Sequence, residues 1–186
     1  MTVRLVIFGR QGAGKGTQAV NIVNTYGVAH ISTGDMLRAA VKAETPMGLK
    51  AKAVMRAGNL VGDDIINGIV AERLQEDDAT GPGFVLDGYP RTINQAEALL
   101  DFLGDNHLDA VIDLDVPLEE VTARMKSRGR ADDTDDGIAR RLDLYEQETR
   151  PVLDFFKEKG LLVTVDGLGT EEEVSSRLIA AINEHL

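Results

Sequence analysis

Short apolar segments recur along the chain, separated by longer stretches whose apolar positions follow a helical spacing. The apolar runs predict five buried strands, at residues 3–8, 28–31, 84–86, 110–114 and 161–165. Strands that alternate with helices are typical of an α/β fold, in which helices cover both faces of a parallel sheet. Because ligands of such folds bind at the carboxyl ends of the strands, we expect the functional residues there.

Two segments interrupt this alternation. Residues 33–77 predict several short helices between two strands, with breaks at Thr45-Pro46 and Gly58-Asn59. Residues 127–137 are charged and loop-like, and they lie between two predicted helices. We expect each segment to form a mobile flap, although a solvated acidic turn is the simpler interpretation of the second.

Composition limits the class of protein. The 186 residues fit one domain, and the absence of cysteine excludes disulfides and thiolate zinc sites. A net charge of −11 argues against general nucleic-acid binding, which requires a basic face. A strand begins within three residues of Met1 and no apolar run is long enough to span a membrane, so we expect a cytoplasmic protein.

Residues 9–17, Gly-Arg-Gln-Gly-Ala-Gly-Lys-Gly-Thr, follow the first strand and precede a helix predicted from Gln18 to Tyr26. Such a loop turns backbone N–H groups toward a polyphosphate, and the start of the helix adds partial positive charge. Lys15 can reach the outer phosphates as a compact charge. In the strict phosphate-binding motif Ser or Thr follows Lys directly, whereas here Gly16 separates Lys15 from Thr17. The alternative interpretation of residues 9–17 is a glycine-rich turn that binds no ligand. The loop predicts a nucleoside triphosphate site.

A second polar cluster follows the second strand, at Ser32-Thr33-Gly34-Asp35. Ser32 or Thr33 is expected to cap the next helix. Arg38, about one turn into that helix, can meet a phosphate with its planar guanidinium. Alone this is a weak signal, since a helix cap beside a surface arginine is commoner than a binding site.

The third cluster is Asp87-Gly88-Tyr89-Pro90-Arg91, after a buried strand. An aspartate at that position is costly unless it is paired or serves a metal ion. Mg²⁺ prefers one or two carboxylates together with substrate phosphates. We therefore predict that Asp87 holds Mg²⁺, with a salt bridge to a basic neighbour as the alternative.

Arginines are concentrated near the second flap, at positions 124, 128, 130 and 141. Arg124 and Arg128 share a helix face, where like charges repel unless a polyanion lies between them. Phosphoryl transfer requires such fixed guanidinium groups. Any one of the four is equally explained as a surface arginine, but the set is not.

Of the remaining residues, His30 is expected to pack in its strand, and Thr170 with Glu173 predicts a capped final helix.

The three motifs together resemble the adenylate kinase family of nucleoside monophosphate kinases. The resemblance extends from Thr2 to the last helix, and the Gly16-Thr17 departure from the strict loop motif is the family's own. It implies a P-loop kinase fold with a five-stranded parallel sheet, in a single domain over residues 1–186. A monophosphate-binding lobe at 32–61 and a short lid at 127–137 would be inserted into this domain.

The resemblance also implies roles for individual residues. ATP would be bound by Gly12, Ala13, Gly14, Lys15, Gly16, Thr17, Arg124, Arg128 and Gly169. AMP would be bound by Thr33, Arg38, Asn59, Leu60, Val61, Gly88, Tyr89, Pro90, Arg91, Gln95, Arg130 and Arg141, with Gln95 and the Val61 backbone reading the adenine. The catalytic residues would be Lys15, Arg91, Arg128, Arg130 and Arg141. Asp87 would hold Mg²⁺ through water, no zinc would be bound, and the protein would be a monomer.

Departures from the family pattern affect two positions. Gln11 stands where the family often has proline, so the loop is expected to be less rigid, and Asn59 replaces a frequent lysine. The implied reaction is reversible phosphoryl transfer from MgATP to AMP, giving two ADP. A pyrimidine monophosphate kinase is the first alternative, although Thr33 and Gln95 favour adenine. A P-loop GTPase lacks support because no Asn-Lys-x-Asp motif is present, and a silent binding domain would have no need of all these charges.

Overall fold

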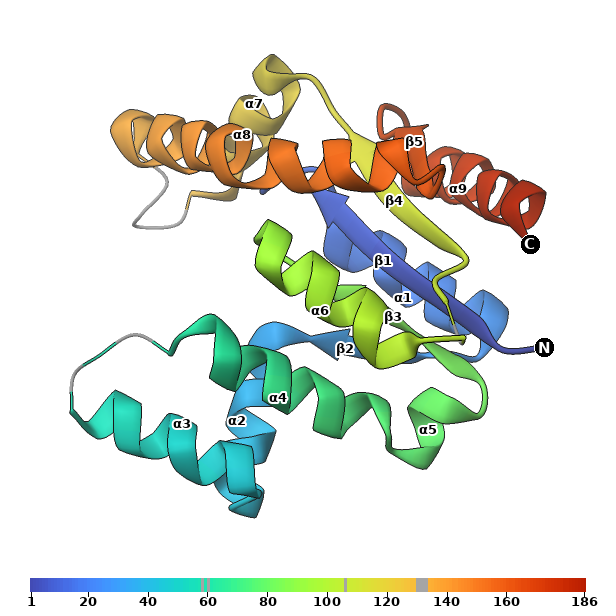
Figure 1. Cartoon of the computed structure of the whole chain (residues 1–186). Coiled ribbons are helices and arrows are strands. Elements are labelled where there is room, and N and C mark those ends of the chain that lie inside the picture. The colour runs from blue at the N-terminus through green and yellow to red at the C-terminus, as the bar shows by residue number, and fades with distance from the viewer. Residues whose placement is uncertain (58, 60, 106, 130–133) are drawn as a thin grey trace.

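The structure is a computed structural model that describes residues 1–57, 59, 61–105, 107–129 and 134–186. Its centre is one parallel sheet with strand order β2-β3-β1-β4-β5 (Figure 1). The strands are β1 (Val3–Gly9), β2 (Ala29–Ser32), β3 (Gly83–Asp87), β4 (Ala110–Asp115) and β5 (Leu162–Asp166). The five strands predicted from the apolar runs are confirmed, and so is the parallel α/β architecture.

Helices lie on both faces of this sheet, because successive strand residues point to opposite sides. Leu5 and Ile7 of β1 pack in one apolar cluster, whereas Val6 and Phe8 pack in a second. The first cluster includes residues of α1 (Lys15–Tyr26), α7 (Leu118–Arg128) and α9 (Glu171–His185). The second includes residues of α2 (Thr33–Ala43), α3 (Pro46–Arg56), α4 (Asp63–Leu74), α5 (Asp77–Thr80) and α6 (Ile93–Leu103). The long helix α8 (Asp135–Glu158) contributes to both clusters.

The starts of the helices follow local chemistry. Ser32 caps α2 by accepting from the Asp35 N–H, and Thr170 and Glu173 form the predicted capping box at α9. Thr45 caps α3, which begins at Pro46, so the predicted break there is confirmed. Gly58, part of the other predicted break, lies outside the described residues.

Two expectations about local structure are wrong. Helix α1 begins at Lys15 rather than at Gln18, because Gly14 takes a left-handed conformation (φ 91°) that turns the chain directly into the helix. His30 does not pack in the core: it is exposed, and its ring faces Asp87. Within the described part of the chain, no helix is long and apolar enough to cross a membrane.

Candidate active site

The glycine-rich loop borders the larger of two adjoining cavities, with a volume of about 740 Å³. A side chain added at Gly14 or Gly16 would meet nothing within 4 Å, so the loop backbone is open to a ligand. Ala13 is different, because its side chain is buried and its N–H already donates to the Arg10 carbonyl at 2.9 Å. The residues from the sequence prediction that line this cavity are Gly12, Gly14, Lys15, Gly16, Thr17, Gly88, Arg91, Arg128 and Arg141.

Lys15, which lines the larger cavity, forms an ion pair with Asp87. Lys15 Nζ lies 2.6 Å from Asp87 Oδ1, and the Asp87 side chain is only 15% exposed. His30 Nε2 lies 3.2 Å from the other carboxylate oxygen. Burial opposes the charge of Asp87, but the contacts with His30 and Lys15 prevail and hold the pKa of its carboxyl below the ordinary value. The salt bridge considered from sequence is therefore present.

Register explains why these groups meet. In the parallel pairs of the sheet, Ile7 and Ser32 both lie beside Asp87. Helix α2 begins directly after Ser32 and β1 ends two residues after Ile7, so both following segments lie near Asp87 at the carboxyl edge of the sheet. The convergence of the three polar clusters on one edge is confirmed.

The second cavity, of about 500 Å³, lies on the α2–α4 side and shares Gly88, Arg91 and Glu148 with the first. Thr33 Oγ1 donates to the Gly88 carbonyl at 2.8 Å, and Arg91 Nε donates to the same oxygen at 2.8 Å. Five residues predicted for AMP binding line this cavity: Thr33, Val61, Gly88, Arg91 and Gln95.

Gln95 is held at both ends of its amide. Its Oε1 accepts from the Arg91 N–H at 2.7 Å, and its Nε2 donates to Asp63 Oδ1 at 2.8 Å. Only 6% of Gln95 is exposed. Its amide is thus oriented by the Arg91 N–H at one end and by Asp63 at the other.

Other residues predicted for AMP binding lie elsewhere. Tyr89 is fully buried, with its hydroxyl donating to Asn67 Oδ1 at 2.7 Å, and Pro90 is buried as well, so their side chains are not offered to a ligand. Arg38 is 74% exposed and pairs with Asp35 at 2.5 Å. Asn59 does not line either cavity. Leu60 and Arg130 lie outside the described residues.

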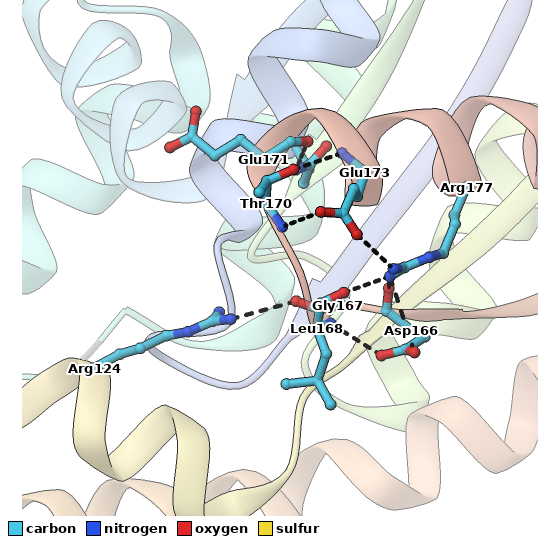
Figure 2. A network of polar contacts seen from close by, with 9 residues as sticks. Arg124, Asp166, Gly167, Leu168, Thr170, Glu171, Glu173 and Arg177 are labelled. Atoms are coloured by element: carbon cyan, nitrogen blue, oxygen red, sulfur yellow. Dashed lines mark hydrogen bonds and ion pairs between the residues drawn. The ribbon is translucent and has the colours of Figure 1, made fainter.

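Arg124 joins the glycine-rich loop to the end of β5. Its guanidinium donates to the carbonyls of Gly12 at 3.2 Å, Ala13 at 3.3 Å and Gly167 at 3.4 Å. Figure 2 shows Arg124 reaching Gly167 from α7, next to the loop that contains Leu168. Gly169 in this loop has a φ of 121°, a conformation that favours glycine. The loop after β5 therefore lies beside the glycine-rich loop.

Arg141 lies on α8 and reaches the glycine-rich loop from the other side. Its Nη1 donates to Gln11 Oε1 at 3.2 Å, and its Nε donates to the Gly137 carbonyl. Gln11, the departure from the family pattern, thus provides a contact with Arg141 that proline could not make.

Three residues at the site escaped the sequence prediction. His30 contacts Asp87, Asp63 orients Gln95, and Glu148 borders both cavities. His30 could have been found from the sequence, because it is a polar residue within the short apolar run at 28–31. Asp63 and Glu148 stand on helices whose placement against the sheet is a long-range property, and their local sequence gave no sign of it.

Comparison with known proteins identifies the family. The adenylate kinase family model matches residues 7–161. An adenylate kinase from Nocardia farcinica is 50% identical over 182 residues, covering 97% of this chain and 99% of the relative. Adenylate kinases from Stenotrophomonas maltophilia (strain R551-3) and Leifsonia xyli subsp. xyli are each 47% identical over 186 residues, covering 97% of this chain and 99% and 93% of the relatives. The chain belongs to the adenylate kinase family. The P-loop kinase fold implied by the sequence motifs is thereby confirmed.

Proposed function

We propose that the protein catalyses reversible transfer of the terminal phosphoryl group from MgATP to AMP, giving two ADP. The observation that carries this proposal is the pair of adjoining cavities with a shared wall of Gly88, Arg91 and Glu148. One cavity has a phosphate-binding loop and the other does not, so a triphosphate donor and a monophosphate acceptor can meet at Arg91. Membership of the adenylate kinase family supports the same reaction.

In this proposal the chain acts by positioning and by neutralising charge. The loop N–H groups and Lys15 hold the donor phosphates, while Arg91 holds the acceptor phosphate at the shared wall. Arg128 and Arg141 line the donor cavity and stabilise the charge that spreads over the transferred group. Arg130 and Arg38 belong to the same proposed set. No covalent intermediate and no strong general base are required.

Asp87 is the residue that would hold Mg²⁺, through a water molecule. It fits this ion because it is a partly buried carboxylate with a lowered pKa, placed 2.6 Å from the lysine of the phosphate-binding loop. When bound, Mg²⁺ would neutralise charge on the donor phosphates. Among the described residues there is no group of three or more His, Asp or Glu side chains that could bind a metal ion without a nucleotide.

The donor base would lie between Arg124 and the loop at 167–169, and the acceptor base would lie near Gln95 and Val61. Closure of a monophosphate lobe at 32–61 and a lid at 127–137 would exclude water and suppress hydrolysis of ATP. We further propose that the protein acts as a monomer in the cytoplasm, with no nucleic-acid or membrane partner.

A coupled assay that measures ADP formation tests the reaction. MgATP is offered with AMP, UMP, CMP or GMP as acceptor, with and without EDTA. We expect ADP only with AMP, and none in EDTA. Preference for UMP or CMP would retain the transfer mechanism but overturn the adenine assignment of Thr33 and Gln95, and no transfer to any acceptor would reject the proposed function.

The variant Lys15→Ala provides the matching residue test. Removal of one charged group that stabilises the transition state costs about 10²- to 10³-fold in kcat. Because the Lys15 side chain is 31% exposed, we expect the variant to remain folded, as circular dichroism would show. Near-normal kcat in this variant would remove Lys15 from the mechanism.

A further inference from the structure

The loop between β5 and α9, residues 167–170, and the last residue of β5 are held from two sides by arginines. Arg124 reaches the Gly167 carbonyl from α7, and Arg177 reaches the loop from α9 (Figure 2). Arg177 Nη1 donates to the Asp166 carbonyl at 2.8 Å and to the Leu168 carbonyl at 2.6 Å. One guanidinium nitrogen thus holds two carbonyls that are two residues apart, which fixes the turn between them.

Carboxylates compensate the charge of Arg177. Its guanidinium lies 3.9 Å from Asp166 Oδ2 and 3.7 Å from Glu173 Oε2. The other oxygen of Asp166 accepts from the Leu168 N–H at 2.9 Å, and Glu173 also belongs to the capping box of α9. With two acidic neighbours, Arg177 is poorly suited to hold a phosphate. Its contacts are those of a residue that positions backbone.

The same contacts explain the glycines of the loop. A Cβ at Gly169 would lie 3.1 Å from Glu173 Oε2 and 3.2 Å from Arg177 Nη2, so a side chain there would disturb this ion pair. A Cβ at Gly167 would lie 2.5 Å from a methyl group of Val116. The turn is therefore packed on its inner side, while Leu168 remains 39% exposed on its outer side.

The position of the loop relates it to the base of the donor. Arg124 contacts both the phosphate-binding loop and Gly167, so the two loops are neighbours. The acceptor cavity lies on the α2–α4 side of the glycine-rich loop and the larger cavity extends along α8, whereas Arg124 and Gly167 lie on the side of α7 and α9, where we place the donor base. We propose that Arg177 is a positioning residue for recognition of the donor base: by holding the Asp166 and Leu168 carbonyls, it fixes the backbone against which the base of the triphosphate is bound. This inference rests on the proposed function only in placing the donor base beside this loop.

Binding experiments with Arg177→Met separate this role from a general structural one. The wild type and the variant are titrated calorimetrically with MgATP, MgGTP and inorganic tripolyphosphate, the last of which has phosphates but no base. In Arg177→Met the loop is no longer fixed and must be ordered when the base binds. The free-energy cost of this ordering should weaken MgATP binding by about five- to tenfold. Tripolyphosphate affinity and the KM for AMP should change by less than about twofold, and the preference for MgATP over MgGTP should fall.

Two further variants complete the design. Arg177→Lys retains a donor for the carbonyls but loses the simultaneous contact with Glu173, so its MgATP affinity should lie between those of the wild type and Arg177→Met. Arg73→Met is the matched control, because Arg73 pairs with Asp78 at 2.6 Å on α4 and its loss should leave all three affinities unchanged. If Arg177→Met does not fold, the affinities of Arg177→Lys decide the question.

Equal weakening of MgATP and tripolyphosphate would overturn the proposal, and so would unchanged binding of MgATP. Failure of the proposed function would be distinct, because it would show as absence of transfer to AMP in the wild type, irrespective of how MgATP and tripolyphosphate bind.

Discussion

The ion pair between Lys15 and Asp87 predicts that Asp87→Asn changes the affinity for ATP in opposite directions with and without Mg²⁺. To reach the phosphates of ATP, Lys15 must leave or share the carboxylate that it contacts at 2.6 Å. Asp87→Asn frees Lys15 and removes a negative charge from the site. In the absence of Mg²⁺ the variant should therefore bind ATP more tightly than the wild type, whereas in its presence the loss of the carboxylate should weaken binding and catalysis.

The magnitude follows from the geometry of the pair. At this separation the attraction is on the order of 6 kcal/mol for an effective dielectric constant of about 20. Desolvation cancels most of it, because the Asp87 side chain is 15% exposed and the Lys15 side chain 31% exposed. A net value of about 1 to 2 kcal/mol remains, which corresponds to about five- to thirtyfold tighter binding of Mg²⁺-free ATP by the variant.

Isothermal titration calorimetry with ATP, in EDTA and in excess MgCl₂, measures the change in ATP affinity under both conditions. Asp101→Asn is the control, since it makes the same change in net charge on an exposed part of α6. The reasoning would be refuted if Asp87→Asn weakened ATP binding to the same extent in both buffers. That outcome would mean that Asp87 orders the phosphate-binding loop instead of competing for Lys15.

Two other predictions concern acidic residues. Glu148 borders both cavities, where its carboxylate opposes two polyanions, so Glu148→Gln should lower both nucleotide KM values by about two- to fivefold, and unchanged KM values would refute this. Burial raises the pKa of Asp113 although Arg150 opposes the shift, so the folded state disfavours its charge. The charge therefore costs stability above the unfolded pKa of about 3.9, and Asp113→Asn should raise Tm at pH 7.5, with a gain that shrinks toward pH 4. Thermal unfolding at the two pH values would measure this, and an equal or lower Tm at pH 7.5 would count against it.

Much of the fold was predictable because its signals are local. Each strand is a short apolar run, and Thr170 with Glu173 marks a helix start within four residues. Because functional residues of parallel sheets lie at the carboxyl ends of the strands, the sequence also predicts that the glycine-rich loop and Asp87 are close together.

The failures concern contacts between distant segments. The expectation that His30 would pack was reasonable for a strand residue, but β2 is an edge strand of the sheet, and His30 reaches Asp87 on the neighbouring strand. The start of α1 at Lys15 has no side-chain signal in the sequence, because its cap is a left-handed glycine, Gly14. The contact that orients Gln95 comes from Asp63, 32 residues away, and such a contact leaves no signal in the local sequence.

Four of the described cationic groups predicted to bind nucleotide already have partners inside the protein. These pairs are Lys15 with Asp87, Arg38 with Asp35, Arg91 with the Gly88 carbonyl, and Arg141 with Gln11. A phosphate that binds such a group exchanges one partner for another, so its net gain is the difference between two contacts rather than the full value of one. Removing an internal acceptor should then strengthen Mg²⁺-free phosphate binding, whereas removing a donor should weaken it. The effect should be larger for Asp87 than for Asp35, because the Asp35 side chain is 74% exposed and water already screens its charge from Arg38.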